Sequence, residues 1–130
     1  MKEGLKLGLE QEVTRVVTRD LCVATASGLP PVLATAEMVR MMEYAALLVL
    51  APHYDEGEAS VGSHVSVRHV APAPIGMKVR AMARLTRIDG RHFSFDVAAF
   101  DETELLGDGT HERVVVDVQR LRRRAEEKVK

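Results

Sequence analysis

The most apolar stretch of the chain lies between Thr35 and Pro52, where hydrophobic residues occupy almost every position. A helix that is hydrophobic on nearly every face must be covered by protein rather than half exposed. Thr35 stands where the N-cap of such a helix is expected, and Pro52 stops it. The sequence therefore predicts one long, buried helix over residues 35–50.

The segments on either side of this helix show the short period that is typical of β-strands. An early run over residues 11–18 is rich in β-branched side chains and predicts a first strand. After the helix, near-alternation of apolar and polar residues predicts four more strands, over residues 60–70, 78–89, 91–101 and 105–119.

Glycine and proline mark the connections between these elements. Asp89-Gly90 is a strong hairpin signal between the third and fourth strands. Gly107 and Gly109 suggest a bulge in the last strand, before Val114. Residues 19–34 contain one glycine and two prolines and predict an irregular connection, and the tail from Arg120 is expected to be helical.

One strand, one helix and four antiparallel strands predict an α+β domain that spans residues 1–130. A curved sheet of about five strands would bury the helix on most of its sides. A single sheet keeps an open strand edge, and such edges favour pairing with another chain. We therefore expect a homodimer or a dimer of dimers, in which two sheets join into one continuous sheet.

Composition narrows the class of protein. The chain has 18 Lys and Arg against 19 Asp and Glu, so its net charge of −1 would not attract nucleic acid or an anionic membrane. The apolar run from Tyr44 to Pro52 is too short to span a bilayer, and the first residues lack the pattern of a signal peptide. Because Cys22 is the only cysteine, no internal disulfide is possible. We expect a cytoplasmic protein with no nucleic-acid or membrane partner.

The candidate chemistry begins with Glu43, a carboxylate on the apolar helix. Burying such a group is costly unless it is paired or used. Each candidate also has an ordinary structural alternative. Glu43 could form an ion pair with Arg40, Thr35 could be the N-cap of the helix, and His69 could make a structural hydrogen bond. No metal or cofactor is expected, and surface positions without metal-ligand spacing are predicted for the remaining strand histidines, His64, His92 and His111.

Several short motifs resemble the fluoroacetyl-CoA-specific thioesterase family, in the same order and with matching spacing. They are Val32-Leu-Ala-Thr35, Met42-Glu43-Tyr-Ala, Gly57-Glu-Ala-Ser-Val-Gly62, His69 and Gly109-Thr-His-Glu-Arg113. The resemblance covers nearly the whole chain and implies the hotdog fold, a helix wrapped in a sheet. The family's catalytic threonine, glutamate and histidine correspond in type and spacing to Thr35, Glu43 and His69. A glycine and an arginine of the family's site correspond to Gly62 and Arg113.

The resemblance implies hydrolysis of an acyl-CoA substrate. Glu43 would activate water or attack the thioester itself, and Thr35 would orient Glu43 or the water or act as the nucleophile. His69 would donate to the carbonyl oxygen or move a proton. Gly62 would let the carbonyl approach its backbone N–H, and Arg113 would bind substrate. The structural alternatives are a strand bulge at Gly62 and an ordinary strand-edge charge at Arg113.

The segment before the helix departs from the family's pattern. In the fluoroacetyl-CoA-specific enzyme this connection is longer and carries phenylalanines that gate a hydrophobic lid, whereas residues 19–34 contain no aromatic residue and place Leu29 near one gate. We therefore expect a short-chain acyl-CoA thioesterase without fluorine selectivity. The alternatives are another hotdog enzyme of the hydratase or dehydratase type and a non-catalytic acyl-CoA-binding sensor.

Overall fold

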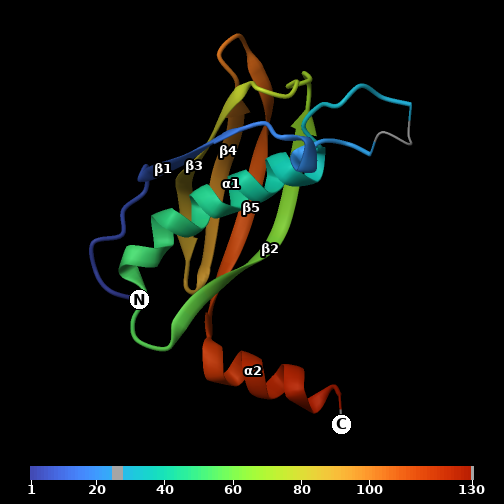
Figure 1. Ribbon diagram of the computed structural model, residues 1–130. Helices are drawn as coiled ribbons and strands as arrows, with labels where there is room; N and C mark the ends of the chain where they lie inside the picture. The colour runs from blue at the N-terminus through green and yellow to red at the C-terminus, as the bar shows by residue number, and fades with distance from the viewer. Residues whose placement is uncertain (25–27, 130) are drawn as a thin grey trace.

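In the computed structural model, which describes residues 1–24 and 28–129, one antiparallel sheet carries a long helix on one face (Figure 1). The strands are β1 (Glu10–Val16), β2 (Glu58–His69), β3 (Lys78–Asp89), β4 (His92–Phe100) and β5 (Leu105–Asp117). The helices are α1 (Thr35–Leu50) and α2 (Val118–Glu127), with short 3-10 turns at Arg19–Leu21 and Ala51–His53. The predicted strands and helices are thus confirmed, with ends that differ by no more than two residues.

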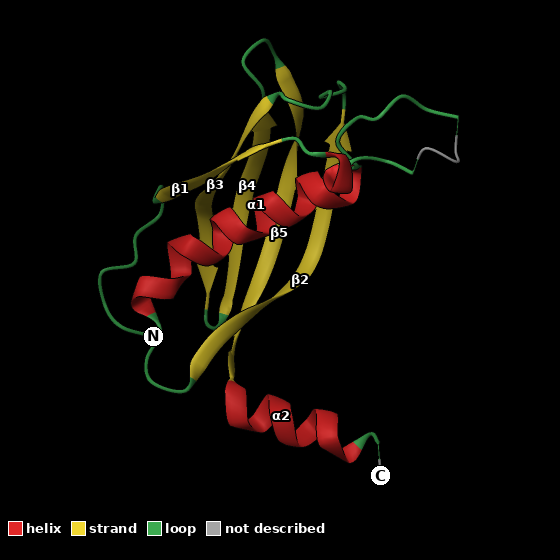
Figure 2. Cartoon of the chain, viewed as in Figure 1, coloured by secondary structure: helices red, strands yellow, loops and turns green. Residues whose placement is uncertain are grey.

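The order of the strands across the sheet is β1-β3-β4-β5-β2, so β1 and β2 are the two edge strands. β3, β4 and β5 form a meander in the middle, and the predicted hairpin turns at Gly90, whose φ is +62°. Because α1 connects one edge strand to the other, it runs obliquely across the whole sheet (Figure 2). It therefore reaches residues of β1, β3, β4 and β2.

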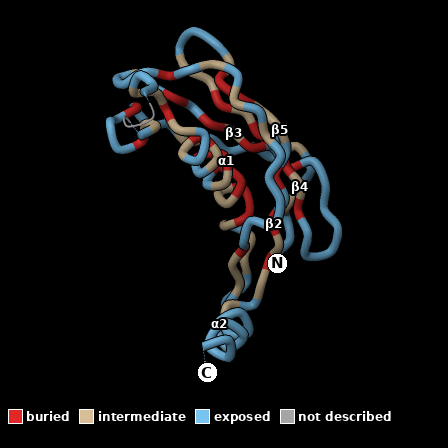
Figure 3. The backbone as a smooth tube through the Cα atoms, turned by 90° about the vertical axis from the view of Figure 1, so that its right-hand side faces the viewer, coloured by how far each residue is buried: buried red, intermediate tan, exposed pale blue. Residues whose placement is uncertain are grey.

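The core lies between α1 and the concave face of the sheet (Figure 3). The methionines of the helix fill irregular gaps against the strands. The buried residues of α1 are Met38, Met41, Met42, Ala45, Ala46, Val49 and Leu50. The opposite side of α1 carries Arg40 and Tyr44, which are exposed. Among the described residues, the sheet covers one side of the helix and leaves the side of Arg40 and Tyr44 exposed, because five strands form one open layer rather than a closed barrel.

Gly107 and Gly109 allow β5 to approach β2 closely. A Cβ on Gly107 would lie 2.5 Å from the backbone oxygen of Arg68, and one on Gly109 would overlap the backbone of Ser66. The irregularity in register against β4 falls between Leu105 and Gly107. The predicted bulge thus precedes both glycines, and the glycines themselves are explained by the contact between the two backbones.

The C-terminal helix α2 stands apart from the body of the molecule, and none of its described residues is buried (Figures 1 and 3). Its N-cap is Asp117, whose carboxylate accepts a hydrogen bond from the backbone N–H of Arg120 at 2.9 Å. Within the described residues, no helix is both long and apolar enough to cross a bilayer.

Candidate active site

Thr35 and His69 meet at one end of α1. The Oγ1 atom of Thr35 lies 2.8 Å from Nδ1 of His69, at the last position of β2. The N-cap of α1 is Ala34, which makes no side-chain capping hydrogen bond. Thr35 is the first residue of the helix. The prediction that Thr35 caps the helix is therefore wrong, because its hydroxyl is directed at the imidazole instead. We call these two residues the threonine–histidine pair.

The threonine–histidine pair borders a shallow hollow. Among the described residues, the Nε2 atom of His69 is buried and has no hydrogen-bond partner, which is rare for a buried polar atom. The rest of the lining is aliphatic: Val23, Val32, Leu33, Val70, Ala71 and Pro72. Leu29, expected near a lid position, does not line the hollow, and its side chain is 55% exposed.

Glu43 lies over Gly62 of β2. Its Oε1 atom is 3.2 Å from the point that a Cβ on Gly62 would occupy, as is Cε1 of His111, while Nη1 of Arg113 is 3.7 Å away. Three polar side chains thus converge above a glycine, where any larger residue would crowd them. We call Glu43, Gly62, His111 and Arg113 the glutamate cluster.

The ordinary interpretations of Glu43 and Gly62 have different outcomes. Arg40 lies 3.6 Å from the carboxylate of Glu37, so the expected alternative of an Arg40–Glu43 pair is wrong. The register of β2 against β5 does shift between Gly62 and His64, so the strand bulge is present. Gly62 therefore lies next to a strand bulge and is also closely packed against polar side chains.

Arg113 is 5% exposed, which rules out an ordinary strand-edge charge. Its Nε donates to Oγ of Ser60 at 2.8 Å, and its Nη2 donates to the backbone oxygen of Ser60 at 2.9 Å. The hydroxyl of Tyr54 lies 2.6 Å from the same Oγ. Burial lowers the pKa of Arg113, while Tyr54 and Glu43 oppose this shift. The guanidinium is therefore fixed in place beside Glu43.

His111 is 1% exposed, so its predicted surface position is wrong. Its Nδ1 lies 2.9 Å from the backbone oxygen of His64, which can only accept, so Nδ1 carries the hydrogen. Nε2 then accepts from Nη1 of Arg113 at 3.2 Å. Burial lowers the pKa of His111 and the charge of Arg113 adds to this, against the hydrogen bond to His64 and the charge of Glu43. His111 is therefore a neutral imidazole.

The sequence contains a signal for the burial of His111. His111, Arg113 and Val115 alternate along β5, and residues two apart on a strand share one face. Val115 belongs to the buried face, so the two polar residues before it do as well. His64 and His92, in contrast, are exposed as expected, and His64 lies 3.5 Å from the carboxylate of Glu112.

Within one chain, the five predicted site residues fall into two groups. Thr35 and Glu43 are eight positions apart on the helix, which corresponds to about 12 Å along the axis of α1. Gly62 and His69 are seven strand residues apart, about 23 Å along β2. The threonine–histidine pair and the glutamate cluster therefore form separate parts of the molecule.

Comparison with known proteins places the chain in a family. Residues 17–119 match the sequence model of the family described as fluoroacetyl-CoA-specific thioesterase, FlK. The fluoroacetyl-CoA thioesterase of Streptantibioticus cattleyicolor is 37% identical over 99 residues, which cover 76% of this chain and 71% of that protein.

Solved structures show the same relationship. A structure of the fluoroacetyl-CoA thioesterase FlK has a TM-score of 0.92 at 32% identity, covering 97% of this chain and 98% of that chain. A Thermus thermophilus hypothetical protein described as a thioesterase superfamily member has a TM-score of 0.88 at 34% identity, with 97% and 96% covered. The predicted hotdog fold of a helix on a curved antiparallel sheet is thereby confirmed.

Proposed function

Because the chain belongs to the fluoroacetyl-CoA-specific thioesterase family, we propose that it hydrolyses short-chain acyl-CoA thioesters to the free acid and CoA. Family membership makes the protein a thioester hydrolase. The observation that carries the choice of substrate is the position of the threonine–histidine pair, whose 2.8 Å contact borders a shallow aliphatic hollow. A hollow of this kind suits a small acyl group beside a polar reaction centre.

Hydrolysis of a thioester requires an activated water and donors for the carbonyl oxygen as it gains charge. In our proposal the hydroxyl of Thr35 donates to Nδ1 of His69, and the Nε2–H of His69 donates to the carbonyl oxygen. Glu43 removes a proton from water as the water oxygen bonds to the carbonyl carbon. The C–S bond then breaks, and the departing thiolate of CoA takes the proton from Glu43. Gly62 and Arg113 hold the substrate beside Glu43.

The separation of the two groups supports a site that two subunits share. About 12 Å of helix separates Thr35 from Glu43 in one chain, which is too far for both to act on the same carbonyl carbon. The edge strand β2 lies beside both groups, and its residues 61–66 are exposed on both faces. We propose that β2 pairs with a second copy to form a continuous sheet. Glu43 of one subunit then faces the threonine–histidine pair of the other.

A mixing experiment tests this shared site. Glu43→Ala and His69→Ala subunits are each expected to be inactive, but a mixed dimer would contain one complete site. A statistical mixture would therefore recover about one quarter of the wild-type activity. The matched control mixes Thr35→Ala with His69→Ala, which damages the same group in both subunits and should recover nothing. Subunit exchange is followed by native mass spectrometry, and exchange without recovery would contradict the shared site.

A panel of thioesters tests the substrate class. We expect acetyl-CoA, propionyl-CoA and fluoroacetyl-CoA to be hydrolysed with comparable kcat/KM, because small shape differences in an apolar pocket yield only about 1–3 kcal/mol. Free-thiol release measures hydrolysis, and crotonyl-CoA hydration is followed by absorbance. A preference for fluoroacetyl-CoA of about a thousandfold or more would contradict the lack of fluorine selectivity. Hydration without thiol release would indicate a hydratase, and binding without turnover would indicate a sensor.

A further inference from the structure

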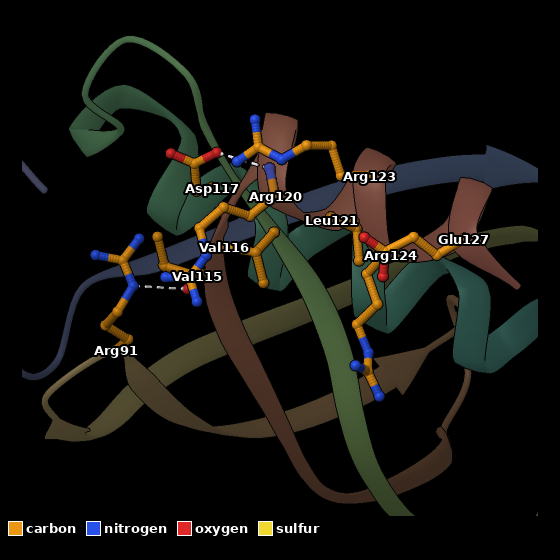
Figure 4. Close-up of a pocket in the computed structure, with 9 residues that line it drawn as sticks. All are labelled: Arg91, Val115, Val116, Asp117, Arg120, Leu121, Arg123, Arg124 and Glu127. Carbon is orange, nitrogen blue, oxygen red and sulfur yellow. Dashed lines mark hydrogen bonds between the residues drawn. The ribbon is translucent and has the colours of Figure 1, made fainter.

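A groove lies between α2, the end of β5 and Arg91, which is in the turn before β4 (Figure 4). Its volume of about 410 Å³ is in the range of small-molecule sites. It is lined by Arg91, Val115, Val116, Asp117, Arg120, Leu121, Arg123, Arg124 and Glu127. Figure 4 shows Arg91 at one end and the α2 residues Arg123, Arg124 and Glu127 at the other. We call this feature the arginine groove.

The arginine groove has an excess of positive charge, with four arginines against two acidic residues. Arg91 is already fixed, since its Nη2 donates to Oε2 of Glu58 at 3.0 Å and its Nε to the backbone oxygen of Val115 at 2.9 Å. In the described part of the chain, no carboxylate lies within 4.0 Å of the side chains of the other three, Arg120, Arg123 and Arg124.

The three unpaired arginines belong to one side of α2, because residues three and four apart on a helix are neighbours. Like charges at this spacing repel each other, so an anion that lies among them would relieve this repulsion. Guanidinium groups bind phosphate oxygens in a bidentate manner. The groove therefore suits a ligand that carries several phosphate charges close together.

The groove begins next to the glutamate cluster. Val115 is two residues beyond Arg113 on β5, about 7 Å along the strand. Val115 also pairs with Ser60, the residue whose hydroxyl and backbone oxygen hold Arg113. A molecule whose thioester lies at the glutamate cluster can thus extend a flexible arm toward α2.

From these observations we infer that the arginine groove binds the 3′-phosphate and the pyrophosphate of CoA, with the pantetheine arm reaching from there to the reaction centre. This inference rests on the proposed function, because the ligand is the same acyl-CoA. It adds that the nucleotide end of the substrate is recognised electrostatically, so that α2 distinguishes acyl-CoA from a thioester of pantetheine alone.

The test compares two double variants on two substrates. Arg123→Gln with Arg124→Gln removes two charges from the groove. Arg122→Gln with Lys128→Gln removes two charges from exposed positions of α2 and its C-cap that do not line it. Each is assayed with the best short acyl-CoA and with the pantetheine thioester of the same acid. Size-exclusion chromatography and melting temperature show whether each variant keeps the wild-type assembly and fold.

For the groove variant we expect KM for acyl-CoA to rise roughly tenfold, with kcat within about twofold and kcat/KM for acyl-pantetheine unchanged. The control variant should resemble wild type on both substrates. Added salt should raise KM for acyl-CoA in the wild type and have less effect in the groove variant.

Three results would overturn the inference: an unchanged KM for acyl-CoA, an equal rise in the control variant, or an equal loss on acyl-pantetheine. An equal loss on acyl-pantetheine, together with a change in assembly, would indicate that these arginines bind a partner subunit instead. If the wild type hydrolyses neither substrate, the proposed function fails. Calorimetric binding of CoA itself to the wild type and the groove variant then still tests the groove, and equal affinities would refute it.

Discussion

Replacing Glu43 with glutamine should remove most of the activity while leaving the fold nearly unchanged. Glu43 is half buried on α1, and within the described part of the chain its carboxylate has no hydrogen bond and no ion pair within 4.0 Å. Glutamine has nearly the same volume and helix propensity. The charge of Glu43 stabilises the charged form of the buried Arg113 only through space, without a hydrogen bond. We therefore expect the loss of this charge to change the unfolding free energy by about 1 kcal/mol or less.

The expected effect on catalysis is much larger. A positioned general base contributes about 10²–10⁴-fold in rate, which corresponds to about 2.7–5.5 kcal/mol of activation free energy. A stability loss of about 1 kcal/mol from a total of roughly 5–15 kcal/mol would leave almost all molecules folded. A purely structural role for Glu43 therefore predicts almost no loss of kcat, and a catalytic role predicts a fall of about a hundredfold or more.

The assay measures kcat by free-thiol release with a saturating short acyl-CoA, together with urea unfolding of the same preparations. Glu37→Gln is the matched control. Glu37 lies on the same helix as Glu43, but its carboxylate pairs with Arg40 and has no proposed role in catalysis. Its kcat should remain at the wild-type value. A folded Glu43→Gln protein with nearly normal kcat would show that Glu43 is not the catalytic carboxylate.

Three further substitutions test the surroundings of the site. Gly62→Ala should lower kcat about tenfold, with a small change in melting temperature, because the new Cβ would lie 3.2 Å from a carboxylate oxygen and an imidazole carbon that must both shift; an unchanged kcat would refute the crowding argument. Burial lowers the pKa of His111 from 6.5 in the folded state, so the unfolded state binds the proton more readily and the stabilising contribution of His111 is lost as pH falls below 6.5. His111→Asn, which leaves Arg113 without its imidazole acceptor, should therefore be less stable near neutral pH but show a weaker decline in unfolding free energy between about pH 7.5 and about pH 5; an equal decline in both proteins would contradict a neutral His111. Gly109→Ala should cost about 3 kcal/mol or more in urea unfolding, because its Cβ would overlap the backbone of Ser66; wild-type stability would show that the two strands can separate freely.

Local sequence pattern determined the elements of this protein. The helix over residues 35–50 and the strand over residues 78–89 have the ends that periodicity predicts, because the side chains within each element repeat with its own period. The turn at Asp89-Gly90 likewise follows from the ability of glycine to adopt a positive φ. Thr35, Glu43, His69, Gly62 and Arg113 were also selected from the sequence as candidate site residues, through motifs and spacing that resemble the family.

The contacts of these residues were decided by the tertiary structure. Thr35 faces His69 instead of capping α1, and His111 is buried beside Arg113 instead of lying at the surface. Glu43 and the threonine–histidine pair are also separated in one chain, although the family resemblance places Thr35, Glu43 and His69 in one catalytic set. The physical reason is that spacing fixes which residues share a face of one element, whereas the oblique path of α1 across the sheet fixes which elements meet.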